Sequence, residues 1–241
     1  MSASAVHWHD LECGGYDADL PVWRELARSV AGDVLDVGCG SGRVALDLAR
    51  RGHAVTGLDR DPVLLEALAA RASDLPVAVA EADARDFHLG REFGLVLVAM
   101  QTIQLMGGAD GRDGLLRRAR EHLVPGGLFA AAIADALEGF DDSAPDVLPL
   151  PDMGEYEGWI FSSQPVAVRE HGDRVAIERI RQTVAPDGTM DATDDVVELD
   201  RLDAGRLAGE GEAAGFAVEP GLCIGATDEH VGSEVVILRA P

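Results

Sequence analysis

The sequence predicts an α/β fold in which a doubly wound, mostly parallel sheet carries an antiparallel β insert. In the first half of the chain, short apolar runs alternate with amphipathic helical stretches, which is the pattern of consecutive βαβ units. The run at 93–99 is apolar throughout, as expected of a central strand buried on both faces. From residue 159 onward, apolar and polar residues alternate between short turns, which indicates antiparallel strands.

The individual elements follow from ordinary strand and helix signals. The expected strands lie at 34–37, 54–59, 77–80, 93–99, 128–134, 216–224 and 235–238, with three antiparallel strands between 159 and 199. The expected helices begin near residues 19, 43, 61, 111 and 203. Residues 1–18 are expected to be irregular, and the helix at 111–123 is expected to turn several arginines outward. Residues 136–153 show little periodicity and mark a boundary.

The first strand leads into the most informative stretch of the chain. A run that contains Asp36 meets three glycines at alternate positions, Gly38, Gly40 and Gly42, just before the helical pattern at 43–50. Glycines permit unusual backbone angles and let a ligand approach the N–H groups at the start of a helix. The turn is therefore expected to cradle a ligand.

A second acidic residue narrows the class of ligand. Asp59 ends the second strand, 21 residues after Gly38, where a carboxylate can accept both hydroxyls of a ribose. The glycine spacing is G-x-G-x-G, whereas a dinucleotide turn has G-x-G-x-x-G, whose glycines admit a pyrophosphate. The two features together predict a nucleoside ligand without a diphosphate.

The charge of the chain disfavours several partners. The formal net charge is −23, and all 20 basic residues are arginine. A field of this sign repels phosphate backbones and anionic membrane surfaces, so neither nucleic acid nor a membrane is an expected partner. The absence of lysine also excludes a Walker lysine and a Schiff-base lysine.

Cysteine and histidine spacing argues against a metal centre. Cys13, Cys39 and Cys223 are widely spaced and match no zinc-binding pattern, which indicates a reducing compartment. His7 and His9 alternate in an irregular stretch and define no ligand geometry. No apolar run approaches the roughly 20 residues of a membrane helix, and the start of the chain has no signal-peptide pattern. A cytoplasmic protein without a metal is therefore expected.

Four motifs in this order resemble the class I S-adenosylmethionine-dependent methyltransferases. They are Asp36-x-Gly38-x-Gly40-x-Gly42, Asp59, the segment 81–86 (Glu-Ala-Asp-Ala-Arg-Asp) and the segment 123–128 (Leu-Val-Pro-Gly-Gly-Leu). The resemblance is strong over about 31–135 and holds in outline over 203–241. It implies a seven-stranded, Rossmann-like methyltransferase fold with three parts. Residues 1–135 would form an N-terminal arm and the cofactor-binding core, 136–202 the β insert, and 203–241 the last helix and final two strands.

The resemblance also implies a set of cofactor-binding residues. For S-adenosyl-L-methionine these are Tyr16, Asp36, Gly38, Cys39, Gly40, Gly42, Asp59, Arg60, Asp83, Ala84, Arg85, Ala99 and Gln104. In the family, the acid matching Asp83 takes the exocyclic amine of the adenine, and an aromatic such as Tyr16 lies near the methionine end. The alternatives are a solvated acidic loop for Asp83, an anchored terminal arm for Tyr16 and simple helix packing for Gln104.

The implied reaction is methyl transfer to a small-molecule acceptor, at nitrogen or oxygen. Residues 100–106 lack the D/N-P-P-Y sequence of enzymes that methylate amide or ring nitrogens in protein or nucleic acid. No catalytic base is selected among His9, His171, His230 and Glu155. Two alternatives stay open, namely a non-catalytic binder of the same cofactor and a nicotinamide-dependent oxidoreductase. The insert would serve as a lid, a substrate wall or a homodimer surface.

Overall fold

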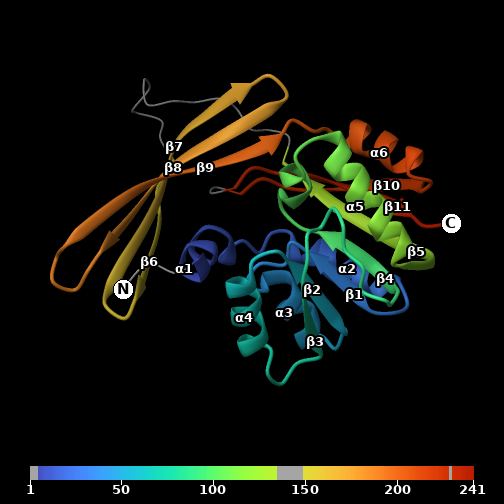
Figure 1. The fold of residues 1–241 in the computed structure, drawn as a ribbon, viewed down its shortest axis with the longest axis horizontal. Helices are drawn as coiled ribbons and strands as arrows, with labels where there is room; N and C mark the ends of the chain where they lie inside the picture. Colours follow the sequence, from blue (N-terminus) through green and yellow to red (C-terminus); the bar gives the residue numbers. More distant parts are fainter. Residues whose placement is uncertain (1–4, 135–148, 228–229) are drawn as a thin grey trace. The chain divides into compact units, whose positions relative to one another are not determined.

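The computed structural model describes residues 5–134, 149–227 and 230–241 (Figure 1). The chain divides into two compact units. The core unit comprises 17–136 and 202–241, and the insert unit comprises 1–16 and 137–201. No helix in the described part of the chain is both long and apolar enough to cross a membrane.

The core unit is built on the seven-stranded, mostly parallel sheet that the sequence predicts. Its strands are β1 (Val34–Val37), β2 (Val55–Asp59), β3 (Val77–Glu81), β4 (Phe93–Val98), β5 (Leu123–Ile133), β10 (Ala217–Ile224) and β11 (Ser233–Arg239). They lie in the order β10-β11-β5-β4-β1-β2-β3, and only β11 runs antiparallel to its neighbours. The all-apolar β4 is the middle strand and is buried along its whole length. This order brings the carboxyl ends of β1, β2 and β3 to one edge of the sheet.

Helices pack along this sheet and complete its core. They are α2 (Leu20–Ser29), α3 (Arg43–Arg50), α4 (Pro62–Arg71), the 3₁₀ turn η2 (Thr102–Leu105), α5 (Ala109–Glu121) and α6 (Ala204–Ala213). Side chains of α5 and α6, such as Leu115 and Leu207, join Val96 and Phe129 of the sheet in one buried cluster. Asp61 starts α4 as predicted, because its side chain accepts hydrogen bonds from the N–H groups of the first turn.

One arginine of α5 is buried, unlike the several that the sequence predicts to face outward. Arg112 is only 1% exposed, and its guanidinium donates two hydrogen bonds of 2.7 Å to the carboxylate of Glu210 in α6. A buried guanidinium is tolerated because a bidentate carboxylate compensates its charge. The two residues are 98 positions apart in the chain, so helical periodicity alone does not predict this pair.

The insert unit contains four antiparallel strands, one more than the sequence predicts. They are β6 (Asp152–Tyr156), β7 (Trp159–His171), β8 (Arg174–Val184) and β9 (Met190–Asp200), in that order. The predicted turns at Gly172 and Gly188 connect the last three strands. β6 begins inside the predicted boundary at 136–153, since its sequence, Asp-Met-Gly-Glu-Tyr, has no clear alternation. Residues 135–148 of that boundary lie outside the described residues.

The N-terminal segment differs from its prediction in both structure and location. It forms α1 (Ala5–His9) and a π-helical turn η1 (Asp10–Gly14), and it belongs to the insert unit rather than to the cofactor-binding core. Glu12 joins this segment to the insert sheet. Its carboxylate accepts two 2.7 Å hydrogen bonds from Arg181 and one of 2.7 Å from Ser163. His7 and Trp8 also contact the ring of Phe161.

Candidate functional site

The glycine turn after β1 has the strained backbone that the sequence predicts. Gly38 and Gly42 have φ angles of +71° and +101°, in the region that favours glycine. A Cβ at Gly38 would lie 2.4 Å from Cγ2 of Thr102, and a Cβ at Gly42 would lie 2.3 Å from Cδ1 of Leu68. Neither position admits a side chain without a shift of its neighbour, and the N–H groups of the turn already donate hydrogen bonds to Leu58, Cys39 and Asp59.

Asp59 holds this turn against the end of β2. One carboxylate oxygen accepts a hydrogen bond from the N–H of Gly40 at 2.9 Å, and the other accepts from the N–H of Asp61 at 3.0 Å. Each carboxylate oxygen can accept a second hydrogen bond, and the residue is partly exposed. Asp59 is therefore a turn residue that retains acceptor capacity for two ligand hydroxyls.

Asp36 is the least satisfied polar group of the core unit. It is 1% exposed, and one oxygen accepts a hydrogen bond from the N–H of Ala45 in the first turn of α3. The residue that precedes this helix, Gly42, has no side chain that could accept that hydrogen bond instead. Its other oxygen, Oδ2, accepts no hydrogen bond from the described residues. Burial raises the pKa of Asp36 to about 7, against the opposing positive charge of Arg43. A buried carboxylate in this state favours a ligand that brings a cation or a donor.

Arg43 and Asp19, whose charges act on Asp36, form an ion pair that sequence reasoning missed. The guanidinium of Arg43 donates to both oxygens of Asp19, at 2.5 and 2.8 Å. The indole nitrogen of Trp23 donates to the same carboxylate at 2.8 Å. Asp19 was expected only to start a helix, yet its side chain makes no cap hydrogen bond. The available signals are an arginine directly after the third glycine and an acid four residues before a tryptophan.

Asp83 follows β3 and forms a tight pair with Arg85. Its carboxylate accepts from the backbone N–H, Nε and Nη2 of Arg85 at 2.9, 2.9 and 2.6 Å. The hydrogen bonds from Arg85 lower the pKa of Asp83 to about 2. The group is half exposed and always ionised at neutral pH, as an acceptor for an amine must be. Its predicted contact with adenine stays a prediction.

A protein-family model matches the part of the chain that contains these candidate residues. Residues 34–127 match the family model described as a methyltransferase domain, which covers the glycine turn, Asp59 and Asp83. This region is a class I S-adenosylmethionine-dependent methyltransferase domain.

Two curated relatives of this region are named as methyltransferases. The chain is 33% identical over 122 residues to a cypemycin N-terminal methyltransferase from Streptomyces sp, covering 50% of each protein. It is 33% identical over 111 residues to a dTDP-3-amino-3,6-dideoxy-alpha-D-glucopyranose N,N-dimethyltransferase from Streptomyces fradiae, covering 46% of this chain and 43% of the relative. The chain thus spans half or less of the length of these relatives.

Solved structures resemble the whole chain in fold. DesVI from Streptomyces venezuelae matches with a TM-score of 0.77 at 21% identity, over 98% of this chain and 99% of that one. CalS10, an amino pentose methyltransferase from Micromonospora echinaspora solved with S-adenosylmethionine, matches with a TM-score of 0.75 at 20% identity, over 100% and 99%. The seven-stranded sheet and the antiparallel insert are therefore a known methyltransferase architecture.

The segment after β4 is anchored to the sheet of the methyltransferase domain. The side-chain amide of Gln104 donates to the carbonyl of Ala134 at 3.1 Å and accepts from its N–H at 3.0 Å. Between Ala99 and η2, Met100 has a φ of +52°, which is unusual for a residue with a side chain. These contacts favour a packing role for Gln104, and its predicted contact with the cofactor stays a prediction, as does that of Ala99.

The remaining predicted residues fall into different settings. The positive charge of Arg60 acts on Asp83, and Ala84 packs against the core cluster. Cys39 is buried, and burial raises the pKa of its thiol, so only its backbone suits ligand binding. Tyr16 belongs to the insert unit, and its place near the methionine end stays a prediction. Within the described residues, no cluster of histidine, cysteine or acidic side chains could hold a metal ion.

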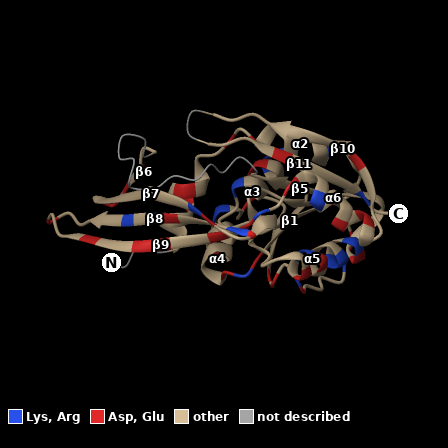
Figure 2. Ribbon diagram, turned by 90° about the horizontal axis from the view of Figure 1, so that it is seen from above, with Lys and Arg blue, Asp and Glu red and all other residues tan. Residues whose placement is uncertain are grey.

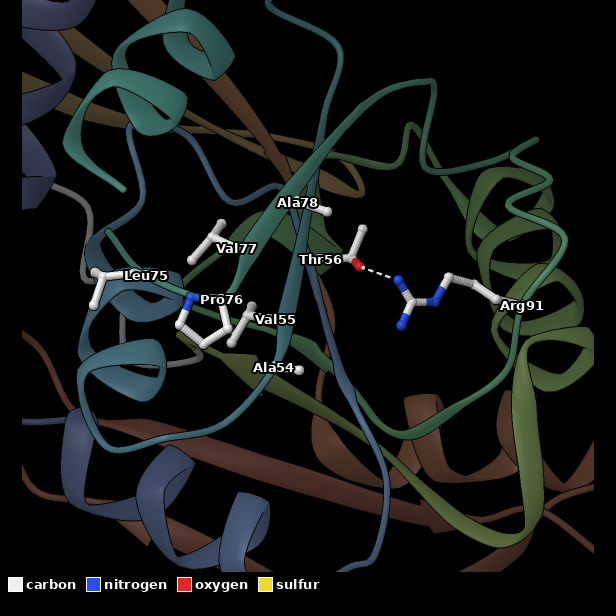
Figure 3. Close-up of a pocket in the computed structure, with 8 residues that line it drawn as sticks. All are labelled: Ala54, Val55, Thr56, Leu75, Pro76, Val77, Ala78 and Arg91. Atoms are coloured by element: carbon white, nitrogen blue, oxygen red, sulfur yellow. Dashed lines mark hydrogen bonds between the residues drawn. The ribbon is translucent and has the colours of Figure 1, made fainter. Parts of the chain in front are cut away.

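A hollow of about 260 Å³ lies away from these residues, at the amino-terminal ends of β2 and β3 (Figure 3). It is lined by Ala54, Val55, Thr56, Leu75, Pro76, Val77, Ala78 and Arg91. Arg91 donates to the hydroxyl of Thr56 at 3.5 Å and is paired with Asp33. Ligands of parallel α/β sheets bind at the carboxyl ends of the strands, so this hollow is not the candidate cofactor site.

Proposed function

We propose that the chain is an S-adenosylmethionine-dependent methyltransferase that methylates an amine of a small molecule. The unsatisfied Oδ2 of buried Asp36, at a glycine turn within a methyltransferase domain, carries this proposal. The cofactor presents an α-ammonium group and a ribose, and two carboxylates of the site suit them. Asp36 would pair with the ammonium, and Asp59 would accept hydrogen bonds from the ribose.

The choice of an amine acceptor rests on two supports. The curated relatives are named for methylation of a peptide N-terminus and of an amino sugar. The net charge of −23, spread over both units (Figure 2), raises the local concentration of cationic amines and repels phosphate backbones. Nucleic acid is therefore not an expected acceptor.

The residues of the chain would act mainly by positioning. When bound, the cofactor supplies a methyl group on a sulfonium, whose thioether is a good leaving group. Asp36 and Asp59 fix the cofactor, and an amine held in line with the methyl group reacts at a high effective molarity, on the order of 10⁵ M or more in favourable cases. The amine attacks through its lone pair, so its proton must leave first, and no residue of the chain is assigned as the base.

Ligand binding followed by turnover tests this function. Calorimetry should show binding of S-adenosylhomocysteine and S-adenosylmethionine at micromolar concentrations and much weaker binding of NAD and NADP. Transfer of labelled methyl groups should then be detected with amino sugars or peptide N-termini and lost with matched hydroxyl analogues. Tighter binding of NAD would contradict the proposal, and cofactor binding without transfer to any acceptor would indicate a non-catalytic binder.

We also propose that the insert unit forms a homodimer through one face of its sheet. The pairing register places Met153, Ile160, Ile180, Val184, Met190 and Val196 on this face, here called the open face. Four of these side chains are 43–65% exposed, which is high for large apolar residues. The opposite face contains Phe161, Ser163 and Arg181, which contact the N-terminal segment.

Sedimentation analysis tests the open face. The wild-type protein should sediment as a dimer, and Met190→Glu should make it a monomer because a charge would be buried in the interface. Val218→Glu is the matched control, since Val218 is an exposed apolar residue of β10 in the core unit. A monomeric wild type, or a dimer that persists in Met190→Glu, would contradict this role of the insert.

A further inference from the structure

The segment 82–92 connects β3 to β4 and forms no helix or strand. It begins beside the candidate cofactor site, because the N–H of Ala82 donates to the carbonyl of Asp59 at 3.0 Å. Its acidic residue Asp83 pairs with Arg85 of the same segment. A segment without a ladder of backbone hydrogen bonds depends on its neighbours for a fixed shape. Here the neighbour is helix α5, which contacts the segment at three places.

The first contact is a close approach at Gly114. This glycine is a buried residue of α5, and a Cβ on it would lie 2.7 Å from the carbonyl oxygen and 3.5 Å from the Cβ of Arg85. Glycine inside a helix is unfavourable relative to alanine, so its presence here needs a reason. The reason is steric, because a side chain at this position would push the segment away from α5.

Two further contacts follow at intervals of four residues, on the same face of α5. Arg118 donates through Nε and Nη2 to Oδ1 of Asp86, with the Nε contact at 3.0 Å. His122, the cap residue at the end of the helix, is 2% exposed, and its Nε2 accepts a hydrogen bond of 2.9 Å from the N–H of Leu89. The ring proton is therefore on Nδ1, which donates to the carbonyl of Arg118 at 2.7 Å. The three residues of α5 thus contact the segment in the order of its own sequence.

The strand order relates this segment to the proposed cofactor. Asp36 lies in β1, Asp59 ends β2, and β3 is the next strand of the sheet. A cofactor with its ammonium group at β1 and its ribose at β2 directs the base on that ribose toward the carboxyl end of β3. The segment that α5 holds begins there, and Asp83 is its first acid.

We propose that Gly114, Arg118 and His122 are positioning residues that hold the segment 82–89 in the shape that contacts the base, and that they thereby set the selectivity for adenine. This inference rests on the proposed function for the identity of the ligand. An ionised carboxylate such as that of Asp83 accepts hydrogen bonds and donates none. It suits the exocyclic amine of adenine and repels a carbonyl oxygen at the same place, provided that its own position is fixed. The three residues act only through the segment.

Two variants disturb the segment, and each has a matched control. Gly114→Ala places a methyl group against the segment, whereas a Cβ at Gly209, a glycine inside helix α6, would meet nothing within 4 Å, so Gly209→Ala is its control. Arg118→Gln removes the contact of its guanidinium with the segment. Its control is Arg120→Gln, because Arg120 lies on the same helix and donates to the carbonyl of Ala214 at 2.6 Å, outside the segment. Arg118→Lys keeps the charge and should restore most of the wild-type behaviour.

Two measurements are made on each variant. Hydrogen exchange of the segment 82–89 in the ligand-free protein should be faster in Gly114→Ala and Arg118→Gln than in the wild type or the controls. The second measurement is the ratio of affinities for S-adenosylhomocysteine and S-inosylhomocysteine, in which a carbonyl oxygen replaces the exocyclic amine of the base. The wild type should prefer S-adenosylhomocysteine about 10- to 150-fold, the range for one charge-assisted hydrogen bond. Gly114→Ala and Arg118→Gln should lower this preference about fivefold or more, and the controls should leave it unchanged.

The affinity ratio separates positioning from a merely structural role. Loss of stability alone would weaken both ligands equally and leave the ratio at its wild-type value, and this result in Gly114→Ala and Arg118→Gln would overturn the inference. If Gly114→Ala does not fold, Arg118→Gln decides the question, because it removes a partly exposed ion pair. A wild-type protein that binds both ligands equally would overturn the selectivity and leave the proposed function intact. A wild-type protein that binds neither ligand would refute the proposed function itself.

Discussion

Two carboxylates, the partly buried Glu12 of the insert unit and the buried Asp36 of the core unit, differ in how their charge is compensated. In the insert unit, burial opposes the ionisation of Glu12, but hydrogen bonds from Arg181 and Ser163 outweigh it and lower its pKa. In the core unit, Arg43 gives its hydrogen bonds to Asp19, and burial raises the pKa of Asp36 to about 7. A satisfied carboxylate such as Glu12 joins two segments of the protein. A buried carboxylate with an oxygen that accepts no hydrogen bond, such as Asp36, destabilises the ligand-free protein. The proposed cofactor would supply the missing donor.

The largest expected effect is that of Asp36→Asn on cofactor affinity. The loss of a buried negative charge opposite the ammonium group should weaken binding of S-adenosylhomocysteine about 30-fold or more. The cofactor-free variant should nevertheless be more stable than the wild type at pH 8, by about 1–3 kcal/mol of unfolding free energy. An Asp36→Asn variant that binds S-adenosylhomocysteine with wild-type affinity would show that Asp36, like Glu12, has no role in ligand binding.

The sign of this stability effect follows from proton binding. The pKa of Asp36 is about 7 in the folded protein, above its ordinary value of 3.8, so the folded state holds more protons between these pH values. Wild-type stability should therefore fall as pH rises from about 4 to about 7, and Asp36→Asn should lack this contribution. Asp47→Asn is the control, and this variant should be less stable than the wild type. The hydrogen bond from Arg24 lowers the pKa of Asp47, so the charge of Asp47 stabilises the fold. The contribution of Asp47 is lost only as pH falls below 3.8, so denaturant unfolding from about pH 8 to about pH 2 measures both effects.

The next largest effect is expected for Asp59→Ala. Removal of a carboxylate that accepts two ribose hydroxyls should reduce affinity about 10- to 150-fold, and thermal stability should fall as well, because the N–H groups of Gly40 and Asp61 lose their acceptors. Calorimetry and thermal unfolding of the same variant measure the two effects. A variant that keeps its affinity within threefold and loses only stability would assign Asp59 to the turn alone.

Glu12→Gln tests the other half of the comparison. The ionised Glu12 is stabilised in the fold, so its contribution should be present above pH 4.5 and be lost as pH falls through its lowered pKa. The substitution should cost about 1–2 kcal/mol of stability at pH 7 and make the N-terminal segment easier to cleave with a protease. Cofactor affinity should change only if Tyr16, four residues further on, contributes to the pocket. Unchanged proteolysis would show that Glu12 does not hold this segment.

The smallest effect is expected for Asp61→Ala, the neighbour of Asp59. Its side chain caps α4 and makes no predicted ligand contact, so the cost should be about 1 kcal/mol of stability with little change in affinity. Thermal unfolding and calorimetry, run beside Asp59→Ala, compare the two acids directly. A tenfold loss of affinity in Asp61→Ala would move the ribose contact to this residue.

Local patterns were sufficient for most of the fold. The strands of the core sheet, the glycine turn and the cap at Asp61 follow from periodicity and from the backbone preferences of glycine, aspartate and proline over a few residues. β6 was missed because five mostly exposed residues carry little alternation. Helical structure in residues 5–14 was missed for a similar reason, since its stabilising partners lie more than 140 residues away in the insert unit.

The candidate site was predicted less completely than the fold. Motif spacing identified Asp36 and Asp59, but not that Asp59 is engaged with Gly40 and Asp61, nor that Arg43 pairs with Asp19. The contacts of Asp59 with Gly40 and of Arg43 with Asp19 join residues 19 and 24 positions apart, and such tertiary contacts leave no periodic signal. The same holds for the pair between Arg112 and Glu210. Motif spacing thus predicts candidate ligand-binding groups more readily than the side chains that pair near them.

The outer strand of the insert sheet has a consequence for behaviour at high concentration. β9 is an edge strand in the four-stranded order, and five of its eleven residues are acidic: Asp191, Asp194, Asp195, Glu198 and Asp200. An uncovered edge is a template on which another chain can add a strand, and repeated addition leads to fibrils. Like charges along β9 oppose the approach of a second copy at this edge. Neutralisation of these acids at low pH is therefore expected to allow open-ended aggregation that the protein resists at neutral pH.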